Sequence, residues 1–181
     1  LYASSSDFQQ TNTLGGEAPS EGTGGVTEAF KRRVVLPFAG SLAETDHVLG
    51  HELVHAFQYS MTGQRSSGGF ANPTATRLPL WFIEGMAEYL SVGPIDPHTA
   101  MWMRDAVRKD KLPAISDLGS GAYFPYRWGQ ALWAYIAGRW GDPVVGRILK
   151  TAGRHGDAEN AIERILGVKS ADLSKEWHEA L

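Results

Sequence analysis

Cysteine is absent from the 181-residue sequence. Its absence excludes disulfides, thiolate ligands for zinc and a cysteine nucleophile. Any metal site must therefore be built from histidine and carboxylate side chains. Whether the protein works in an oxidising or a reducing compartment is left open.

The sequence also lacks an excess of positive charge and a long apolar segment. Lys and Arg number 17 and Asp and Glu number 20, which gives a net charge of -3 and a pI near 6.1. Because no basic surface is available to neutralise phosphates, nucleic-acid binding is not expected. No apolar run approaches the roughly 18 residues that a membrane span needs, and the sequence, which begins at Leu1 rather than Met, shows no charged-then-apolar leader segment. We expect a soluble piece of a longer protein without a membrane span.

Length and composition fit a single domain. With 43% hydrophobic residues, 181 residues can bury a core without disulfides. We predict one mainly helical α+β domain over residues 1–181. It has a short sheet segment and loops in 1–40, two site-bearing helices in 41–95 and a helical part in 96–181.

Capping residues and hydrophobic periodicity predict the individual elements. The β-branched and aromatic run from Val34 to Phe38 predicts a short strand. The polar, glycine-rich stretches 4–25 and 62–77 are predicted to be loops, the second a mobile one. Helices are predicted over 42–61, 79–93, 97–109, 127–140, 143–154, 158–166 and 171–181.

The most specific motif is His51-Glu52-Leu53-Val54-His55, an H-E-x-x-H sequence inside the helix predicted over 42–61. Residues four apart differ by about 40° around a helix, so both imidazoles project from one face toward one tetrahedral cation. Glu52 lies about 100° further round, beside the metal. From there its carboxylate can take the proton of a zinc-bound water. His51 and His55 are therefore predicted zinc ligands, and Glu52 is the predicted general base.

A catalytic zinc needs a third protein ligand and an open position. Glu84 interrupts a mainly apolar predicted helix, and a cation is the natural compensation for a buried carboxylate. The adjacent Gly85 is expected to let the helices of His51 and Glu84 approach closely. Glu88, one turn further, is predicted to accept a hydrogen bond from the outer nitrogen of a ligand histidine. The alternative for Glu88 is an exposed helix charge.

These residues resemble a known family. The H-E-x-x-H sequence followed by Glu84-Gly85-Met86-Ala87-Glu88-Tyr89 looks like the gluzincin metallopeptidases, whose aminopeptidase-N-like members have an E-G-x-A pattern beginning with the zinc-ligand glutamate. Pro125-Tyr126-Arg127-Trp128-Gly129 resembles their P-Y-x-x-G segment, and Gly24-Gly25-Val26-Thr27-Glu28 resembles their glycine-rich edge strand at the substrate cleft. The pattern is closest to bacterial peptidase-MA-like domains and spans roughly Phe8 to Leu181.

The resemblance implies a thermolysin-like gluzincin core that hydrolyses peptide bonds, with one Zn²⁺ per chain held by His51, His55 and Glu84. It implies a peptide or protein substrate, a β-propeller domain in a longer parent chain and a bacterial secreted or periplasmic location. The sheet segment is expected to lie over the pair of zinc-binding helices. Whether cleavage is internal or starts from a free N-terminus is left open.

The same resemblance implies roles for residues outside the metal site. Tyr126 is expected to stabilise the oxyanion, and Tyr123 is the alternative donor. Gly24, Gly25 and Glu28 are expected to contact the substrate, and Glu28 would bind the α-amine of a substrate N-terminus.

Other readings of the same residues are a catalytically inactive, zinc-stabilised interaction domain and a hydrolase of non-peptide amides or esters. His47 lies one turn before His51 and is predicted to be an outer neighbour of the site or solvent-exposed.

An elongated metzincin motif is excluded, because Gln58 and Met61 stand where it requires glycine and histidine. The isolated histidines His98, His155 and His178 are not predicted to be ligands.

Overall fold

The computed structural model describes residues 1–10, 23–28, 33–63, 65–66, 69–70 and 74–181. Within these ranges the chain is mainly helical, with a small antiparallel sheet near the N-terminus, as predicted for the fold class. The helices are α1 (Ser5–Gln10), α2 (Leu42–Thr62), α3 (Leu80–Val92), α4 (Pro97–Arg108), α5 (Pro125–Trp140), α6 (Pro143–His155), α7 (Ala158–Leu166) and α8 (Ser170–Ala180). The strands are β1 (Val26–Glu28), β2 (Arg33–Val35), β3 (Arg65–Ser66) and β4 (Gly69–Phe70), and short 3₁₀ helices span Thr74–Arg77 and Ile115–Gly119.

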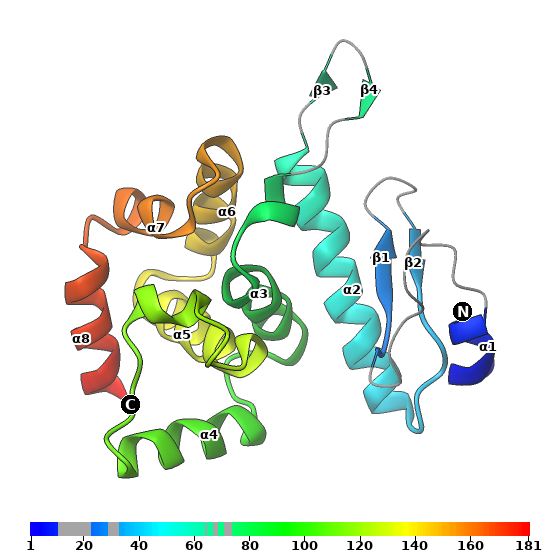
Figure 1. The fold of residues 1–181 in the computed structure, drawn as a ribbon, viewed down its shortest axis with the longest axis horizontal. Coiled ribbons are helices and arrows are strands. Elements are labelled where there is room, and N and C mark those ends of the chain that lie inside the picture. The colour runs from blue at the N-terminus through cyan, green and yellow to red at the C-terminus, as the bar shows by residue number, and fades with distance from the viewer. Residues whose placement is uncertain (11–22, 29–32, 64, 67–68, 71–73) are drawn as a thin grey trace.

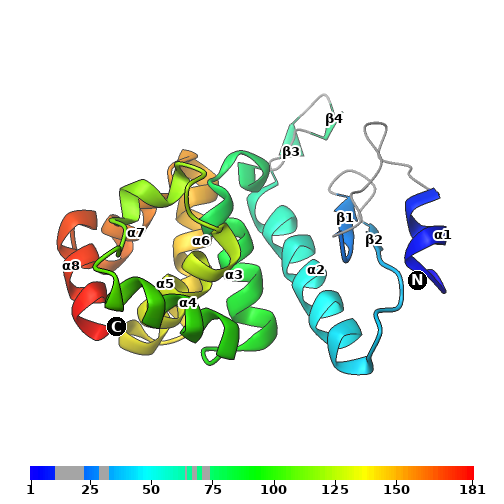
Figure 2. The ribbon, with the colours of Figure 1, turned by 60° about the horizontal axis from the view of Figure 1, so that its bottom comes forward.

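Helix α2 lies between the β1–β2 hairpin and the other large helices (Figures 1 and 2). The hairpin is antiparallel, with Thr27 opposite Val34 and Glu28 opposite Arg33. On the other side of α2, helix α3 packs against α2 and α5, and helices α6 to α8 complete the helical part. Among the described residues no helix is long and apolar enough to cross a bilayer.

Helix α2 starts where its capping residues predict. The Ser41 side chain accepts a hydrogen bond from the Glu44 amide at 3.1 Å, and Glu44 is acidic in the first turn, where the helix dipole favours negative charge. At the other end the Gly63 amide donates to the carbonyl of Tyr59 at 2.9 Å. The helix is 21 residues long, and its face toward α3 carries the buried residues His51, His55 and Gln58.

The N-terminal region differs from the prediction of loops. Residues Ser5–Gln10 form α1, in which the Ser4 hydroxyl accepts from the Asp7 amide and Phe8 is buried. A six-residue helix with one buried side chain is too short to show a period in the sequence. The strand predicted from Val34 to Phe38 is β2, Arg33–Val35, and the chain beyond it pairs with Tyr2 through a single bridge at Pro37. Strands β3 and β4 lie in the stretch 62–77 that was predicted to be a loop, and this prediction was also wrong.

The tightest packing in the described chain is between α3 and α5. A Cβ atom at Gly85 would overlap the backbone of Gly129, and a Cβ atom at Gly129 would overlap the carbonyl oxygen of Trp81. The prediction that Gly85 serves the approach of α3 to the His51 helix is therefore wrong, because Gly85 faces α5. Where α2 meets α3, the close contact is made by Gly50 and Ser91. A Cβ atom at Gly50 would lie 3.3 Å from the Cβ atom of Ser91.

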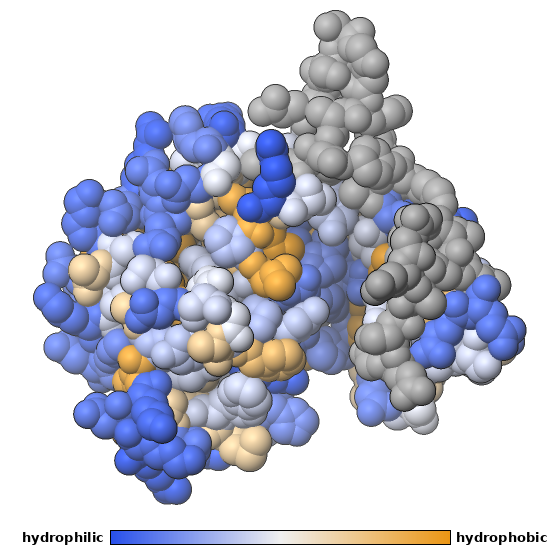
Figure 3. Space-filling view, viewed as in Figure 1, coloured by the Kyte–Doolittle hydropathy of each residue, from blue (hydrophilic) through white to orange (hydrophobic). Residues whose placement is uncertain are grey.

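Among the residues that the structure describes, one apolar core lies between the helices around α5. Its largest fully buried side chains include Phe82 from α3, Trp133 and Ile136 from α5, and Trp177 from α8. The indole nitrogen of Trp133 donates to the carbonyl of Phe82 at 3.0 Å, which fixes α5 against α3. Trp133 and Trp177 thus belong to the core. In the view of Figure 3 the face over α7 and α8 is mostly hydrophilic, with apolar residues gathered nearer the middle.

Candidate metal and active site

The two histidines of the H-E-x-x-H sequence and Glu84 meet at one point between α2 and α3. Nε2 of His51 lies 3.1 Å from Nε2 of His55. Oε2 of Glu84 lies 3.0 Å from the first nitrogen and 3.2 Å from the second. Ligand atoms bound at about 2.0–2.1 Å to a tetrahedral ion are about 3.3 Å apart, so this triangle is close to the size that such an ion needs.

The opposite ring nitrogens of the two histidines each face an acceptor oxygen. Nδ1 of His51 lies 2.9 Å from Oε1 of Glu88, and Nδ1 of His55 lies 2.8 Å from Oε1 of Gln58. Both acceptors need a proton on Nδ1, which leaves the Nε2 lone pairs directed at each other and at Glu84. A proton on one Nε2 satisfies only part of this cluster, whereas one cation contacts all three atoms. The donor set therefore fits a metal ion.

Each of these histidines also has a tyrosine stacked on its ring. Tyr126 stacks on His51 with centroids 5.7 Å apart and planes at 19°. Tyr59 stacks on His55 at 6.1 Å and 17°. A stacked ring together with an acceptor at Nδ1 fixes both the position and the rotation of each imidazole.

Glu88 connects the candidate metal site to a wider network of charges. Besides His51, its Oε1 contacts Nε2 of His47 at 3.0 Å, and its Oε2 accepts from Arg127 at 3.1 Å. Arg127 donates also to Asp96 at 3.1 Å. Glu88 is only 4% exposed, so these partners provide the compensation that a buried carboxylate requires. His47 lies outside the three-atom site and contacts it through Glu88.

The protonation of the cluster follows from burial and these contacts. Burial disfavours the charged form of His51, but hydrogen bonds to Glu84 and Glu88 outweigh it and raise the pKa of His51 to about 9. Burial likewise opposes charge on Glu84, yet His51 and His55 lower the pKa of Glu84 to about 2. The pKa of Glu88 is lowered to about 2 against burial by His47 and His51. A positive charge is therefore strongly favoured where the three ligand atoms meet.

Glu52 lies on the side of α2 that faces β1. The Thr27 hydroxyl lies 2.6 Å from Oε2 of Glu52 and 2.8 Å from its backbone carbonyl. A Cβ atom at Gly25 would lie 2.9 Å from Cγ of Glu52, so only glycine lets β1 approach this closely. Gly24 packs beside it, against Val48. The glycine pair thus contacts the helix and the glutamate.

Glu28 points away from this contact. Side chains alternate along a strand, so Glu28 faces the opposite side of β1 from Thr27. Its buried carboxylate forms an ion pair with Arg33, the residue opposite it in the hairpin. The role expected for Glu28, binding a substrate amine, would require this ion pair to be shared or broken.

The two candidate oxyanion donors occupy different surroundings. Tyr126 lies at the start of α5 and contacts His51, and burial together with the charge of Glu84 and a hydrogen bond to it raises the pKa of Tyr126. Glu52 and Glu88 add to this effect, so the hydroxyl keeps its proton and can donate it in a hydrogen bond. Tyr123 instead packs edge-on against Trp128, at 5.5 Å, and borders the apolar core.

Several neighbours of the site were not identified from the sequence. Gln58 could have been suspected, because it lies three residues after His55 on the same helix face. Arg127 adjoins Tyr126 in the motif, but its partners come from α3 and the residue before α4. No pattern in the sequence indicates that Thr27 or Tyr59 lies at the site, because their contacts depend on how the elements pack together.

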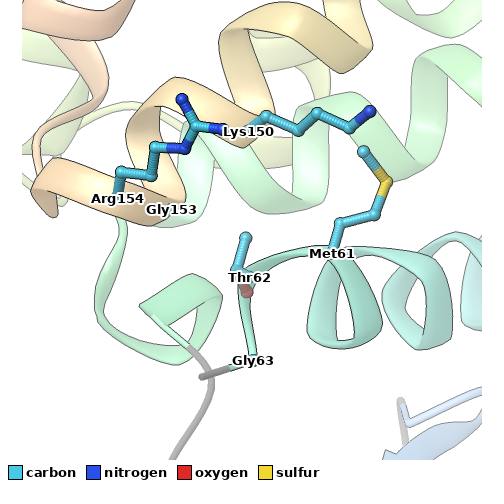
Figure 4. A pocket seen from close by; sticks show the side chains of 6 residues that line it. All are labelled: Met61, Thr62, Gly63, Lys150, Gly153 and Arg154. Atoms are coloured by element: carbon cyan, nitrogen blue, oxygen red, sulfur yellow. The ribbon is translucent and has the colours of Figure 1, made fainter. Parts of the chain in front are cut away.

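A separate pocket lies at the C-terminal end of α2. Its volume is about 360 Å³, and Lys150 and Arg154 of α6 flank it (Figure 4). Its other lining residues are Met61, Thr62, Gly63 and Gly153. A Cβ atom at Gly153 would lie 2.7 Å from the Thr62 side chain, so the pocket adjoins a close contact of α2 with α6. It includes none of the predicted site residues.

The arrangement defines a mainly helical protein with a His-His-Glu cluster between two packed helices and a further carboxylate, Glu52, on the side of α2 that faces β1. The chain belongs to the family of unknown function DUF6055, which matches residues 23–180. This range contains every residue of the cluster. No curated protein and no solved structure matches the chain.

Proposed function

We propose that this protein is a zinc-dependent metallopeptidase with a thermolysin-like gluzincin core. The observation that carries the proposal is the triangle of Nε2 of His51, Nε2 of His55 and Oε2 of Glu84, with sides of 3.0–3.2 Å and both Nδ1 atoms held by acceptors. These three residues would hold the zinc. When bound there, the ion supplies Lewis acidity that acidifies water and polarises the substrate carbonyl.

The chain's own residues account for the proton transfers. Glu52, aligned by the Thr27 hydroxyl, takes a proton from the attacking water and returns it to the leaving amine. Tyr126 donates its hydroxyl proton in a hydrogen bond to the developing oxyanion. Glu88 and Gln58 hold the two imidazoles in the tautomer that presents Nε2.

The position of Glu52 favours catalysis over a purely structural metal site. A structural site has no use for a buried carboxylate that lies outside the ligand triangle and is hydrogen-bonded to a strand. The peptide bond as substrate, and the whole gluzincin assignment, rest on the resemblance of the motifs.

Metal content and peptide cleavage test the proposal together. The protein is stripped with a chelator, reloaded with Zn²⁺ and incubated with a peptide library that is read by mass spectrometry. We expect one zinc per chain, and we expect Glu84→Ala to lose stoichiometric binding because it removes a ligand. Glu52→Gln should keep the zinc and lose about 10²-fold or more in rate, as for loss of a positioned base.

Glu179→Gln is the matched control, because Glu179 is exposed on α8 and belongs to no part of the site. Zinc binding without cleavage of any peptide would favour the interaction domain. Cleavage of small esters or amides alone would favour the non-peptide hydrolase. Full zinc binding in Glu84→Ala would show that the ligand set is wrong.

A further inference from the structure

A row of aromatic rings leads from the candidate metal site to the surface. Beyond His51 and Tyr126, which stack at 5.7 Å, Phe124 stacks on Tyr126 with centroids 5.1 Å apart and planes at 29°. Trp102 of α4 continues the row, 5.6 Å from Phe124 at 37°. Each ring thus touches the next, and we name Tyr126, Phe124 and Trp102 the aromatic row.

The outer two rings of the row are partly exposed, unlike the tryptophans of the core. Phe124 is 45% exposed and Trp102 is 39% exposed, whereas the core tryptophans Trp128 and Trp133 are at most 5% exposed. An exposed tryptophan leaves apolar area in water that would be stabilised by burial. Exposed aromatic surface next to a cluster of polar side chains is typical of a ligand-binding site.

Local structure explains why these rings are held at the surface. Helix α4 turns Thr99, Met103 and Ala106 toward the core, and this leaves Trp102 at the edge of the buried face. Phe124 is the residue before Pro125, which starts α5, so its backbone is extended and its ring lies outside the helix. Both rings are therefore carried on ordered elements, which lowers the entropy lost on binding.

We propose that the aromatic row binds an apolar, preferably aromatic, side chain of the substrate next to the bond that is cleaved. The inference rests on the proposed peptidase function, because Tyr126 is the point where the row meets the reacting atoms. Ring against ring is a favourable contact, and it is available without rearrangement of the row.

The charges beside the row favour an apolar side chain over an acidic one. Arg127, the cation next to Tyr126 in sequence, is engaged by Glu88 and Asp96 and has two carboxylates as partners. An acidic side chain of the substrate would have to compete with both. A basic side chain is less easily excluded, and the experiment includes it.

Trp102 gives the cleanest test, because it touches Phe124 and not Tyr126. Loss of Phe124 would also free Tyr126 and alter the catalytic step. The peptide library is therefore digested by the zinc-loaded wild type, Trp102→Ala, Trp102→Phe and Met101→Ala. Met101 is the matched control, since it is a 52% exposed apolar neighbour on α4 that contributes no ring to the row.

We expect wild type to cleave peptides with Phe, Tyr, Trp or Leu beside the scissile bond about tenfold or more faster than those with Ala, Glu or Lys there. Trp102→Ala should cleave the two groups of peptides at nearly the same rate. Trp102→Phe should keep the preference of wild type, and so should Met101→Ala. Equal cleavage of all side chains, a preference for Lys, or an unchanged ratio in Trp102→Ala would overturn the proposal.

A binding experiment separates failure of the aromatic row from failure of the peptidase function. N-acetyl-phenylalaninamide, N-acetyl-alaninamide and cellohexaose are titrated into zinc-loaded Glu52→Gln, with and without Trp102→Ala, and followed by NMR. Tighter binding of the phenylalanine amide, lost with Trp102, supports an aromatic subsite. If the library is also not cleaved, peptidase function fails while the subsite stands. Binding of the oligosaccharide through Trp102 in place of the amide would overturn the proposal in favour of a carbohydrate surface.

Discussion

Two walls of the candidate site are built very differently. On one side, α3 crosses α5 so closely that Gly85 and Gly129 leave no room for a Cβ atom, and a continuous apolar core lies behind them. On the other side, the three-residue strand β1 reaches Glu52 through Thr27 and the glycine at position 25. The proposed ligand Glu84 and the proposed donor Tyr126 belong to the first wall, while the alignment of Glu52, the proposed base, depends on the second. The difference predicts that substitutions at the α3–α5 crossing affect fold and metal binding together, whereas those in the strand affect the reaction rate alone.

The largest effect is expected at the helix crossing. Gly129→Ala places a Cβ atom against the carbonyl of Trp81, so α3 and α5 must move apart. We expect a loss of about 3 kcal/mol or more in the free energy of unfolding, measured by urea denaturation of the zinc-loaded protein. Zinc affinity should fall as well, since Glu84 lies on the displaced helix.

Gly138→Ala is the control for that experiment. Gly138 lies in the same helix, is exposed and has no atom within 4 Å of a built Cβ. Alanine there should raise stability by up to about 1 kcal/mol through helix propensity. Equal effects of the two substitutions would show that the α3–α5 crossing is not as tight as described.

A smaller but chemically specific effect is expected at the same wall. Tyr126→Phe should lower kcat by about 10² to 10³, the usual result of removing one oxyanion donor, with zinc content and stability nearly unchanged. Tyr123→Phe should stay close to wild type, because Tyr123 packs on Trp128. The reverse pattern would assign the role to Tyr123.

The smallest effect is expected at the strand. Thr27→Val removes the hydroxyl beside the Glu52 carboxylate and keeps the shape, so kcat should fall on the order of tenfold, as for one hydrogen bond to a charged group. Zinc content should not change, and KM should change little. Thr151→Val is the control, because within the described chain that hydroxyl bonds the carbonyl of Arg147 in its own helix. Loss of zinc in Thr27→Val would contradict the division between the two walls.

Local signals explain which elements could be predicted from the sequence. Helix α2 was predicted over 42–61 and ends at Thr62, and α7 lies at the predicted residues 158–166, because caps and apolar period are encoded within each helix. The helix predicted over 127–140 is α5, which starts at Pro125, the first-turn position that proline favours. Helix α1 and the pairing of β1 with β2 could not be predicted, because elements of six and three residues carry no measurable period.

The same distinction applies to the site. His51 and His55 are placed by spacing within one helix, and Glu84 is indicated by an acidic residue in an apolar helix, so the sequence could indicate this cluster. The misreading of Gly85 shows the limit, since a glycine signals a close approach without naming the partner. Thr27, Gln58 and Arg127 make their contacts through docking of separate elements, which no local pattern records.

Asp96 has two partners at once, and this links distant parts of the protein. It caps α4 by accepting from the Thr99 amide at 2.7 Å, and it holds Arg127, which reaches Glu88 and so the ring of His51. The capping of α4 and the orientation of the His51 imidazole are thus linked through one chain of hydrogen bonds. Coupling of this kind is reciprocal. If a metal bound at the cluster stabilises the first turn of α4, then a ligand that binds to α4 and stabilises that turn raises the metal affinity by the same free energy.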